Sequence, residues 1–251
     1  KAEDEAGAQS PIIRMPDTSR TWHVRNVTSK ILMVRDIPQA NISAATQYFA
    51  NAFDTIRYDL IDIKANNGAL IPKIINPMWI ATLELYDIVF WTGGSGSVAN
   101  AAIFGLAQQS LPFYLLSGGR VFFSSGFQGV SATGQGELIN FAPVDSVTSC
   151  TIPFINNITD SNLTVVDQNY PGIGPSTLIP AVKGVYTPAR VIYTFFNGQG
   201  CTASPIVVGF KDALSNPRIV YITIPVYFMN RDPQASKDLF RRVFISEFGY
   251  N

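Results

Sequence analysis

Apolar runs typical of buried strands alternate with segments of helical period from Ser29 to Phe127, and this alternation limits the fold more than any other feature. Residues 30–37 (KILMVRDI) form a nearly continuous apolar run, as in a strand that is buried on both faces. The segment 42–56 places its apolar residues at helical spacing, namely Ala45, Tyr48, Phe49, Ala52 and Phe53. The alternation predicts an α/β fold with a parallel sheet between two layers of helices.

The alternation of predicted strands and helices continues to residue 126. Pro112 is predicted to interrupt a helix at 97–119, because proline has no amide hydrogen to donate. Gly118 and Gly119 are predicted to supply the left-handed cap that ends this helix. Further strands are predicted at 58–64, 86–94 and 120–126, with a helix or an irregular turn at 76–86.

Residues 128–204 have a different composition, which is rich in Gly, Pro, Thr, Ser and Asn and shows no helical period. We expect a β-rich insertion of loops and short antiparallel strands. The two cysteines, Cys150 and Cys201, lie within it. Either they form a disulfide in an exported protein, or they are free thiols in a cytosolic one, and the polar texture favours the disulfide. A bridge would close a loop of about 50 residues and contribute about 3–4 kcal/mol to stability.

The C-terminal part returns to the core pattern. Residues 205–211 and 218–229 are predicted to form a pair of strands joined by a turn. Residues 232–249 are predicted to form a final helix, with Pro233 in its first turn and Gly249 as its cap. Its predicted apolar stripe consists of Leu239, Phe240, Val243, Phe244 and Phe248.

Charge and composition argue against several classes of function. The net charge is zero and no basic cluster stands out, so nucleic acid is not an expected partner. No apolar run reaches the roughly 18 residues that a membrane-spanning helix needs. One histidine and two cysteines do not suffice for a zinc site of the usual kind, so no metal is expected. The charged fraction of 14% is low beside the roughly 25% of average proteins, which also suits an exported protein.

A glycine-rich turn follows the strand at 86–94. Its letters Gly94-x-Gly96-x-x-Ala99 match a dinucleotide-binding fingerprint. The fingerprint belongs to the first strand of its unit, however, and requires an acid about 20 residues further on. The strand at 120–126 instead ends in Phe-Ser-Ser-Gly, and no lysine follows the glycines as in a P-loop. We therefore expect a tight turn that needs backbone freedom, and no cofactor.

The segments 87–94 (DIVFWTGG) and 117–129 (SGGRVFFSSGFQG) resemble the corresponding strands of class I glutamine amidotransferase-like domains. The order of elements over 29–127 and 205–249 also resembles that family, especially its divergent secreted bacterial members. The resemblance implies a three-layer, flavodoxin-like fold with a mostly parallel sheet. It covers about 145 residues and concerns the fold more than the activity.

The catalytic residues of that family are not carried over. Its cysteine nucleophile, at a Gly-x-Cys-x-Gly elbow, falls at Ser125, and Phe123 stands where the elbow has its first glycine. The only histidine, His23, precedes the first core strand. Ser125 and Ser124 are thus either polar residues at a strand end or the nucleophile of a degenerate serine hydrolase with an unconventional base.

Other residues are candidates for ligand binding. Asp36 ends the first strand, at the edge where an open parallel sheet presents its ligand cleft, although it also suits a helix cap or a turn. At the end of the strand at 86–94, the cleft candidates are Gly93, Gly94 and Ser95. In the insertion, an exposed aromatic platform for carbohydrate would consist of Tyr170, Tyr186, Tyr193 and Phe195.

We expect residues 29–251 to form one amidotransferase-like domain, preceded by a linker at 1–28. The start of the linker resembles the end of a fibronectin-like or immunoglobulin-like module at Ala2, Asp4, Ala6, Gly7, Ser10 and Pro11. With the missing initiator methionine, this predicts a piece of a multidomain protein. The expected function is a non-catalytic accessory domain of an exported bacterial protein, whose partners are neighbouring domains or an extracellular glycan or protein. The alternatives are the degenerate hydrolase and a carbohydrate-binding module.

Overall fold

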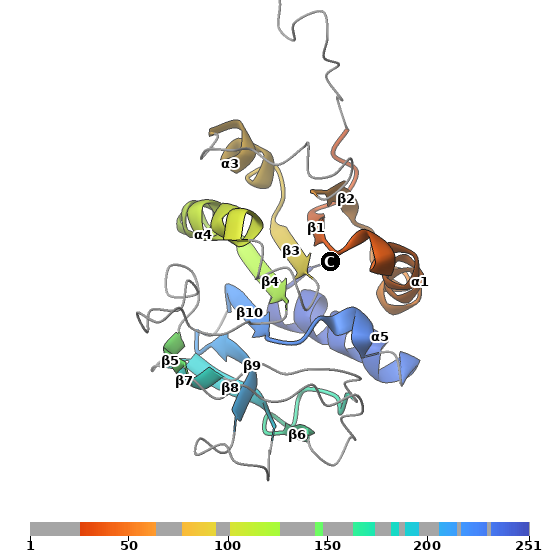
Figure 1. Ribbon diagram of the computed structural model, residues 1–251, viewed down its shortest axis with the longest axis vertical. Coiled ribbons are helices and arrows are strands. Elements are labelled where there is room, and N and C mark those ends of the chain that lie inside the picture. Colours follow the sequence, from red (N-terminus) through yellow and green to blue (C-terminus); the bar gives the residue numbers. More distant parts are fainter. Residues whose placement is uncertain are drawn as a thin grey trace, which may run out of the picture.

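A sheet of ten described strands passes through the molecule and separates two layers of helices (Figure 1). The computed structural model describes residues 26–63, 77–93, 101–125, 144–147, 163–173, 182–185, 189–195, 206–214, 217–229 and 232–250. The proposed end of a β-sandwich module at the N-terminus, like most of the linker at 1–28, lies outside these residues.

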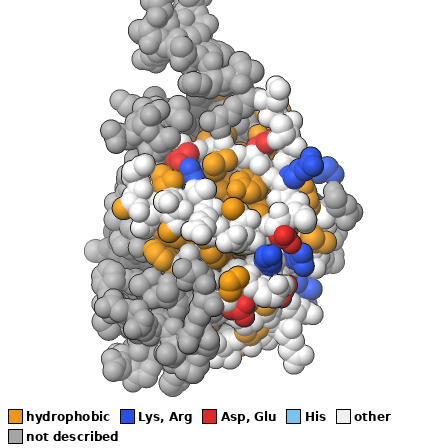
Figure 2. All heavy atoms as spheres, turned by 90° about the vertical axis from the view of Figure 1, so that its right-hand side faces the viewer, with side chains coloured by type: hydrophobic (Ala, Val, Ile, Leu, Met, Phe, Trp, Pro, Cys, Tyr) orange, Lys and Arg blue, Asp and Glu red, His pale blue; other side chains and the backbone are white. Residues whose placement is uncertain are grey.

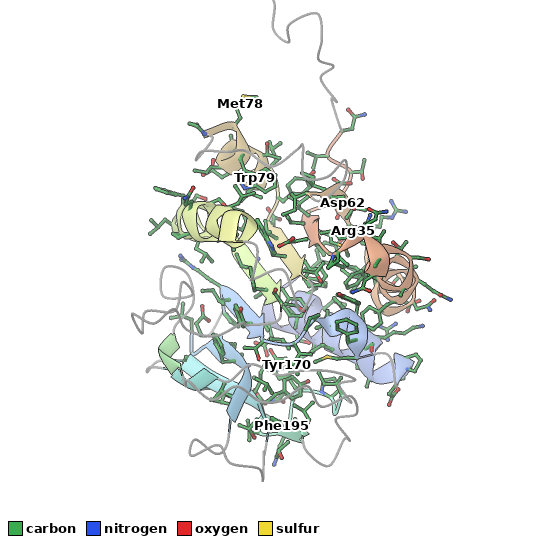
Figure 3. All side chains as sticks on the ribbon, viewed as in Figure 1. Arg35, Asp62, Met78, Trp79, Tyr170 and Phe195 are labelled. Atoms are coloured by element: carbon green, nitrogen blue, oxygen red, sulfur yellow. The ribbon has the colours of Figure 1, made fainter. Side chains whose placement is uncertain are left out.

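The parallel half of the sheet contains five strands in the order β2 (Asp59–Asp62), β1 (Ile31–Asp36), β3 (Ile88–Gly93), β4 (Arg120–Ser124) and β10 (Ile219–Ile222). Every neighbouring pair is parallel. The four strands predicted between residues 30 and 126 are therefore confirmed. At the outer side of β1, Arg35 forms an ion pair of 2.7 Å with Asp62, its register partner on β2 (Figure 3).

Helix α1 (Ile42–Phe53) and helix α5 (Pro233–Arg241) cover one face of this sheet. The five residues predicted at helical spacing on α1 are all buried, which confirms that stripe. Aromatic rings fill the interface, with Phe53 and Phe240 at 4.6 Å and Phe49 and Phe90 at 5.6 Å between ring centroids. Viewed from outside, hydrophobic side chains gather near the middle of this face and charged side chains lie towards its edges (Figure 2).

Helix α3 (Pro77–Leu83) and helix α4 (Ala101–Leu116) cover the opposite face. The segment predicted as a helix or an irregular turn is thus helical. Four buried rings on this face stack in sequence across β3, β4, β10 and the neighbouring strand β9 (Ile206–Asp212). Their centroids are 6.3, 4.9 and 5.1 Å apart along the series Trp91, Phe123, Tyr221 and Phe210.

The predicted interruption at Pro112 is wrong, because α4 continues through it to Leu116. Proline removes one backbone hydrogen bond from the helix, but side chains on both sides of Pro112 are buried against the sheet. Leu106 and Leu111 are among them, as is Tyr114, whose hydroxyl donates a hydrogen bond of 2.9 Å to the Tyr86 carbonyl. Burial of these side chains offsets the lost hydrogen bond.

Two glycines end α4 for different reasons. Gly118 has a φ of +98° and supplies the predicted left-handed cap. Gly119 does not share this conformation, which corrects the prediction for that residue. A Cβ at Gly119 would lie 2.2 Å from the Tyr114 ring, so this position requires glycine because the ring packs directly on the backbone.

The antiparallel half begins with β9, which pairs with β10 as the predicted strand pair. On its other side, β9 pairs with β8 (Ala189–Phe195), which in turn pairs with β6 (Leu163–Val165). Strand β7 (Val182–Val185) also pairs with β9, at Val207, and β5 (Val144–Val147) pairs with β7. The short antiparallel strands predicted in 128–204 are confirmed, and they extend the central sheet. The predicted strand at 218–229 ends at Ile222, because Pro225 cannot donate to a ladder, and Val226–Phe228 form a 3₁₀ turn.

The C-terminal helix begins as predicted, with Pro233 in its first turn and the Asp232 carboxylate accepting from the amides of Gln234 and Ala235. Its predicted apolar stripe is buried. Gly249 has a φ of +65° and caps the end. After Arg241 the helix changes to π geometry over Arg242–Glu247, which the sequence did not indicate.

Replacing Gly119 by alanine tests the close contact with Tyr114. We expect Gly119→Ala to lower the free energy of unfolding by about 1–3 kcal/mol, because the new methyl group must displace a buried ring. Gly172→Ala is the matched control, since its Cβ would meet nothing within 4 Å. Urea unfolding measures both variants, and equal stabilities would contradict the contact.

Candidate functional site

The carboxyl ends of the parallel strands meet at one edge of the sheet, where open α/β sheets present their ligand clefts. Asp36 and Gly93 are register partners at the ends of β1 and β3. Thr92 and Ser124 are register partners on β3 and β4. The predicted candidates Asp36, Gly93 and Ser124 are therefore brought together across three adjacent strands. Gly94 and Ser95 lie outside the described residues.

Ser124 is completely buried, and its hydroxyl is used twice by the backbone. It donates to the Ile224 carbonyl at 2.9 Å and accepts from the Val226 amide at 2.9 Å. These two bonds fix the chain that leaves β10, about 100 positions away along the sequence. A nucleophile must release its proton to a base, whereas this hydroxyl holds two backbone groups that would otherwise be unsatisfied.

Ser125, which the resemblance aligned with the amidotransferase nucleophile, is also buried. Its amide donates to the Ile222 carbonyl at 3.3 Å, so the backbone still follows the ladder with β10. A nucleophile elbow instead requires a sharp, strained turn. Among the described non-glycine residues, only Asp54 at the end of α1 has a positive φ. His23 lies outside the described residues, as do the cysteines.

Asp36 is buried at this edge, close enough to Tyr227 for its charge to act on that hydroxyl. The Asn41 side-chain amide donates to the Tyr227 hydroxyl at 3.3 Å. Burial raises the pKa of Tyr227, and the negative charge of Asp36 raises it further. Asp36 caps neither of the next two helical segments, whose N-cap residues are Pro38 and Asn41. Asp36 is therefore not the N-cap residue of either segment, and its roles as a turn residue or as part of a ligand cleft both stay predictions.

The proposed aromatic platform for carbohydrate is not exposed. Tyr170, Tyr193 and Phe195 each expose 4% or less of their surface and belong to the core cluster under α5. The Tyr193 hydroxyl donates to the Pro171 carbonyl at 2.7 Å. The sequence analysis placed these rings on the surface, whereas they pack in the core cluster that includes the C-terminal helix. The fourth ring, Tyr186, lies outside the described residues.

A cluster of charged side chains, which the sequence analysis missed, joins β9 to the C-terminal π-helical segment. We call Asp167, Lys211, Arg242 and Glu247 the charged cluster. The Lys211 ammonium lies 2.7 Å from Glu247 Oε1 and 3.4 Å from Asp167 Oδ2. Arg242 approaches the same Glu247 oxygen at 2.8 Å. Lys211 and Glu247 are both more than nine-tenths buried, so this is an internal ion network.

The π geometry makes the pair Arg242–Glu247 possible. Residues five positions apart are on well-separated sides of an α-helix, because each residue turns by about 100°. The wider π turn brings the two side chains together and directs Glu247 towards Lys211. Segments of this kind are found frequently at functional sites. The only sequence signal was a charged residue interrupting each of two apolar patterns, at Lys211 and at Glu247.

Tyr170, labelled in Figure 3, lies beside two cations of the charged cluster. Lys211 Nζ lies 5.3 Å and the Arg242 guanidinium 5.6 Å from the centre of its ring, both within cation–π range. Burial raises the pKa of Tyr170, and the nearby Glu247 carboxylate raises it further. Burial alone would raise the pKa of Asp167, but hydrogen bonds from Asn169 and the charge of Lys211 outweigh it and hold that pKa below its usual value.

The charged cluster borders an open hollow of about 610 Å³. Its wall is mainly polar and is formed by β8, β9, the turn after β6 and the C-terminal helix. The lining residues are Val166, Asp167, Gln168, Asn169, Arg190, Val191, Lys211 and Arg242. The register pairs Lys211 with Val220 near the start of β10, so this hollow lies towards the opposite edge of the sheet from Asp36 and Ser124.

Three further points concern the cysteines, metal binding and membrane spanning. Cys150 and Cys201 lie outside the described residues, so their disulfide stays a prediction. Within the described ranges, no three His, Cys, Asp or Glu side chains are grouped in a way that could hold a metal ion. No helix in that part of the chain has the length and apolar character to cross a membrane.

The fold has a counterpart among solved structures. No protein-family model matches the chain, and no curated protein matches it. The crystal structure of a ThuA-like protein from Bacteroides uniformis is similar with a TM-score of 0.51 and 13% identity, over 92% of this chain and 98% of that one. ThuA has a glutamine amidotransferase-like fold. The likeness confirms the predicted α/β, flavodoxin-like and amidotransferase-like fold, and at this identity it shows the fold alone.

Replacing Ser124 by alanine tests its structural role. We expect Ser124→Ala to lower the free energy of unfolding by about 2–4 kcal/mol, because the Val226 amide and the Ile224 carbonyl lose their buried partner. Ser117→Ala removes one hydroxyl bond at an exposed position and should change stability by less than about 0.5 kcal/mol. Chemical unfolding of both variants provides the comparison, and an unchanged Ser124 variant would refute the role.

Proposed function

We propose that this chain is a non-catalytic module with an amidotransferase-like fold, which acts as an interaction domain of an exported multidomain bacterial protein. The observation that carries the proposal is the state of the strand end where the family has its nucleophile. Ser124 there serves two backbone groups, and Ser125 continues the ladder with Ile222. At this edge of the sheet, the two serines therefore make contacts that stabilise the fold.

The absence of a recognisable base in the sequence supports the same conclusion. The single histidine of the chain precedes the first core strand by several residues. A serine hydroxyl is a weak nucleophile unless an imidazole or another base activates it. A degenerate serine hydrolase remains the alternative, and it requires a base within about 3 Å of Ser125 or Ser124.

The outer surface of the α3–α4 layer supports an interaction role. Thirteen of the sixteen residues of helix α4 are apolar or glycine, and its apolar residues are not confined to one face. Phe113 and Leu116 nevertheless expose 51% and 82% of their surface. Met78 on α3 is exposed by 61% and points away from the sheet (Figure 3). Neighbouring domains of the same polypeptide, or an extracellular protein or glycan, are the partners we propose for this layer.

A serine-reactive fluorophosphonate tests the non-catalytic role. We expect intact-mass analysis to find no adduct on the wild-type chain, because two backbone groups engage the Ser124 hydroxyl and Ser125 continues the ladder with Ile222. An active serine hydrolase treated in parallel verifies the reagent. Stoichiometric labelling that disappears in Ser125→Ala or in Ser124→Ala would overturn the proposal in favour of the hydrolase, and retained folding of each variant is checked by circular dichroism.

The exported location predicts a disulfide between Cys150 and Cys201, the two cysteines of the chain. We expect alkylation of the purified, unfolded chain to add no label without reductant and two labels after reduction. Expression with a periplasmic leader provides the oxidising compartment, and the Cys150→Ser variant provides the single-thiol control. Two free thiols in the periplasmic product would contradict this part of the proposal.

A further inference from the structure

Two cations stand directly opposite each other on β8 and β9. The register of the two strands pairs Arg190 with Lys211, and both residues line the hollow beside the charged cluster. Like charges at directly opposed positions of a sheet are destabilising. The Lys211 charge is compensated from the other side by Glu247 and Asp167. Arg190 has no ion-pair partner within the described part of the chain.

The hollow therefore has an excess of positive charge. Three cations, Arg190, Lys211 and Arg242, meet the two carboxylates of Asp167 and Glu247. Both carboxylates are already engaged, since Glu247 bonds Lys211 and Arg242 and Asp167 accepts from the amide and the side chain of Asn169. An additional negative group in the hollow would be attracted to Arg190 and would relieve its repulsion with Lys211.

The remaining wall suits a polar molecule. Gln168 and Asn169 are exposed on one side of the hollow. Lys211 is held rigidly by its buried partners, so little conformational entropy remains to be lost when it meets a ligand. The guanidinium of Arg190 presents a planar set of donors that matches the oxygens of carboxylate, phosphate or sulfate groups.

We propose that this hollow binds a small polar molecule through one oxyanion group, which the Arg190 guanidinium receives with the Lys211 ammonium behind it. The sheet and the π-helical segment supply the two fixed walls, and the turn at Asp167–Asn169 supplies the third. The site is at the opposite edge of the sheet from the strand-end serines. It does not depend on the proposed non-catalytic role, because either result of the fluorophosphonate experiment leaves it untouched.

Titration of the full chain with small oxyanions tests the site. The probes are inorganic phosphate, sulfate and acetate, each added at constant ionic strength in place of chloride and followed by amide NMR shifts. We expect saturable shifts at Gln168, Asn169 and Arg190. Arg190→Ala should weaken binding by about tenfold or more, since it removes a charged hydrogen-bonding group. A preference for phosphate and sulfate, or for acetate, supports the proposal and identifies the oxyanion.

Arg57→Ala is the matched control, because it removes the same charge from an exposed position beside β2. It should bind the probes like the wild type. Stability separates a ligand role from a structural one: Arg190→Ala should unfold at the same or a higher temperature than the wild type, because a like-charge contact is lost. Shifts that do not saturate, equal weakening in Arg57→Ala, or a destabilised Arg190→Ala would each overturn the proposal.

Discussion

The stacked rings that cross four strands are the contact on which the rest of the molecule depends. Trp91, Phe123, Tyr221 and Phe210 lie on one face, with interplanar angles of 18°, 16° and 2° between neighbours. Only in-register strands can place rings above one another in this way. The series joins the parallel strands to the antiparallel strand β9, so one core spans both halves. The Tyr221 hydroxyl is buried and has no hydrogen-bond partner within the described residues, a cost that the burial of the four rings offsets.

The register fixed by these rings determines what each edge of the sheet can do. Ser124 follows Phe123 directly and therefore points to the other face, where its hydroxyl reaches the chain leaving β10. Lys211 follows Phe210 in the same manner and points towards the C-terminal helix, where it meets Glu247. The same alternation thus places a neutral structural hydroxyl at one edge and a buried charge towards the other.

Local patterns could be read from the sequence, and contacts between distant segments could not. The stripe on α1 follows from spacing and the four strands between residues 30 and 126 follow from apolar runs, and both were predicted correctly. Pro112 was misjudged because the burial of Leu111 and Tyr114, which offsets the lost hydrogen bond, depends on the sheet. The rings of Tyr170 and Tyr193 were placed on the surface because nothing local shows that the C-terminal helix covers them. Among the site residues, Asp36 and Ser124 follow from strand order, whereas Lys211 and Glu247 are 36 positions apart and meet only through the π turn.

The energetics of the charged cluster favour a role other than stability. A buried ion pair contributes little more than well-packed apolar side chains of the same volume, and it often contributes less. Lys211 and Glu247 could therefore be replaced by apolar residues at small cost if packing were their only purpose. The π segment adds a departure from regular helix geometry to hold Glu247 in place, and Arg190 adds a like charge opposite Lys211. The buried ion pair, the π segment and the like-charge pair all lie around one open hollow. Functional sites commonly retain features that lower stability, so this coincidence favours a binding role for the hollow.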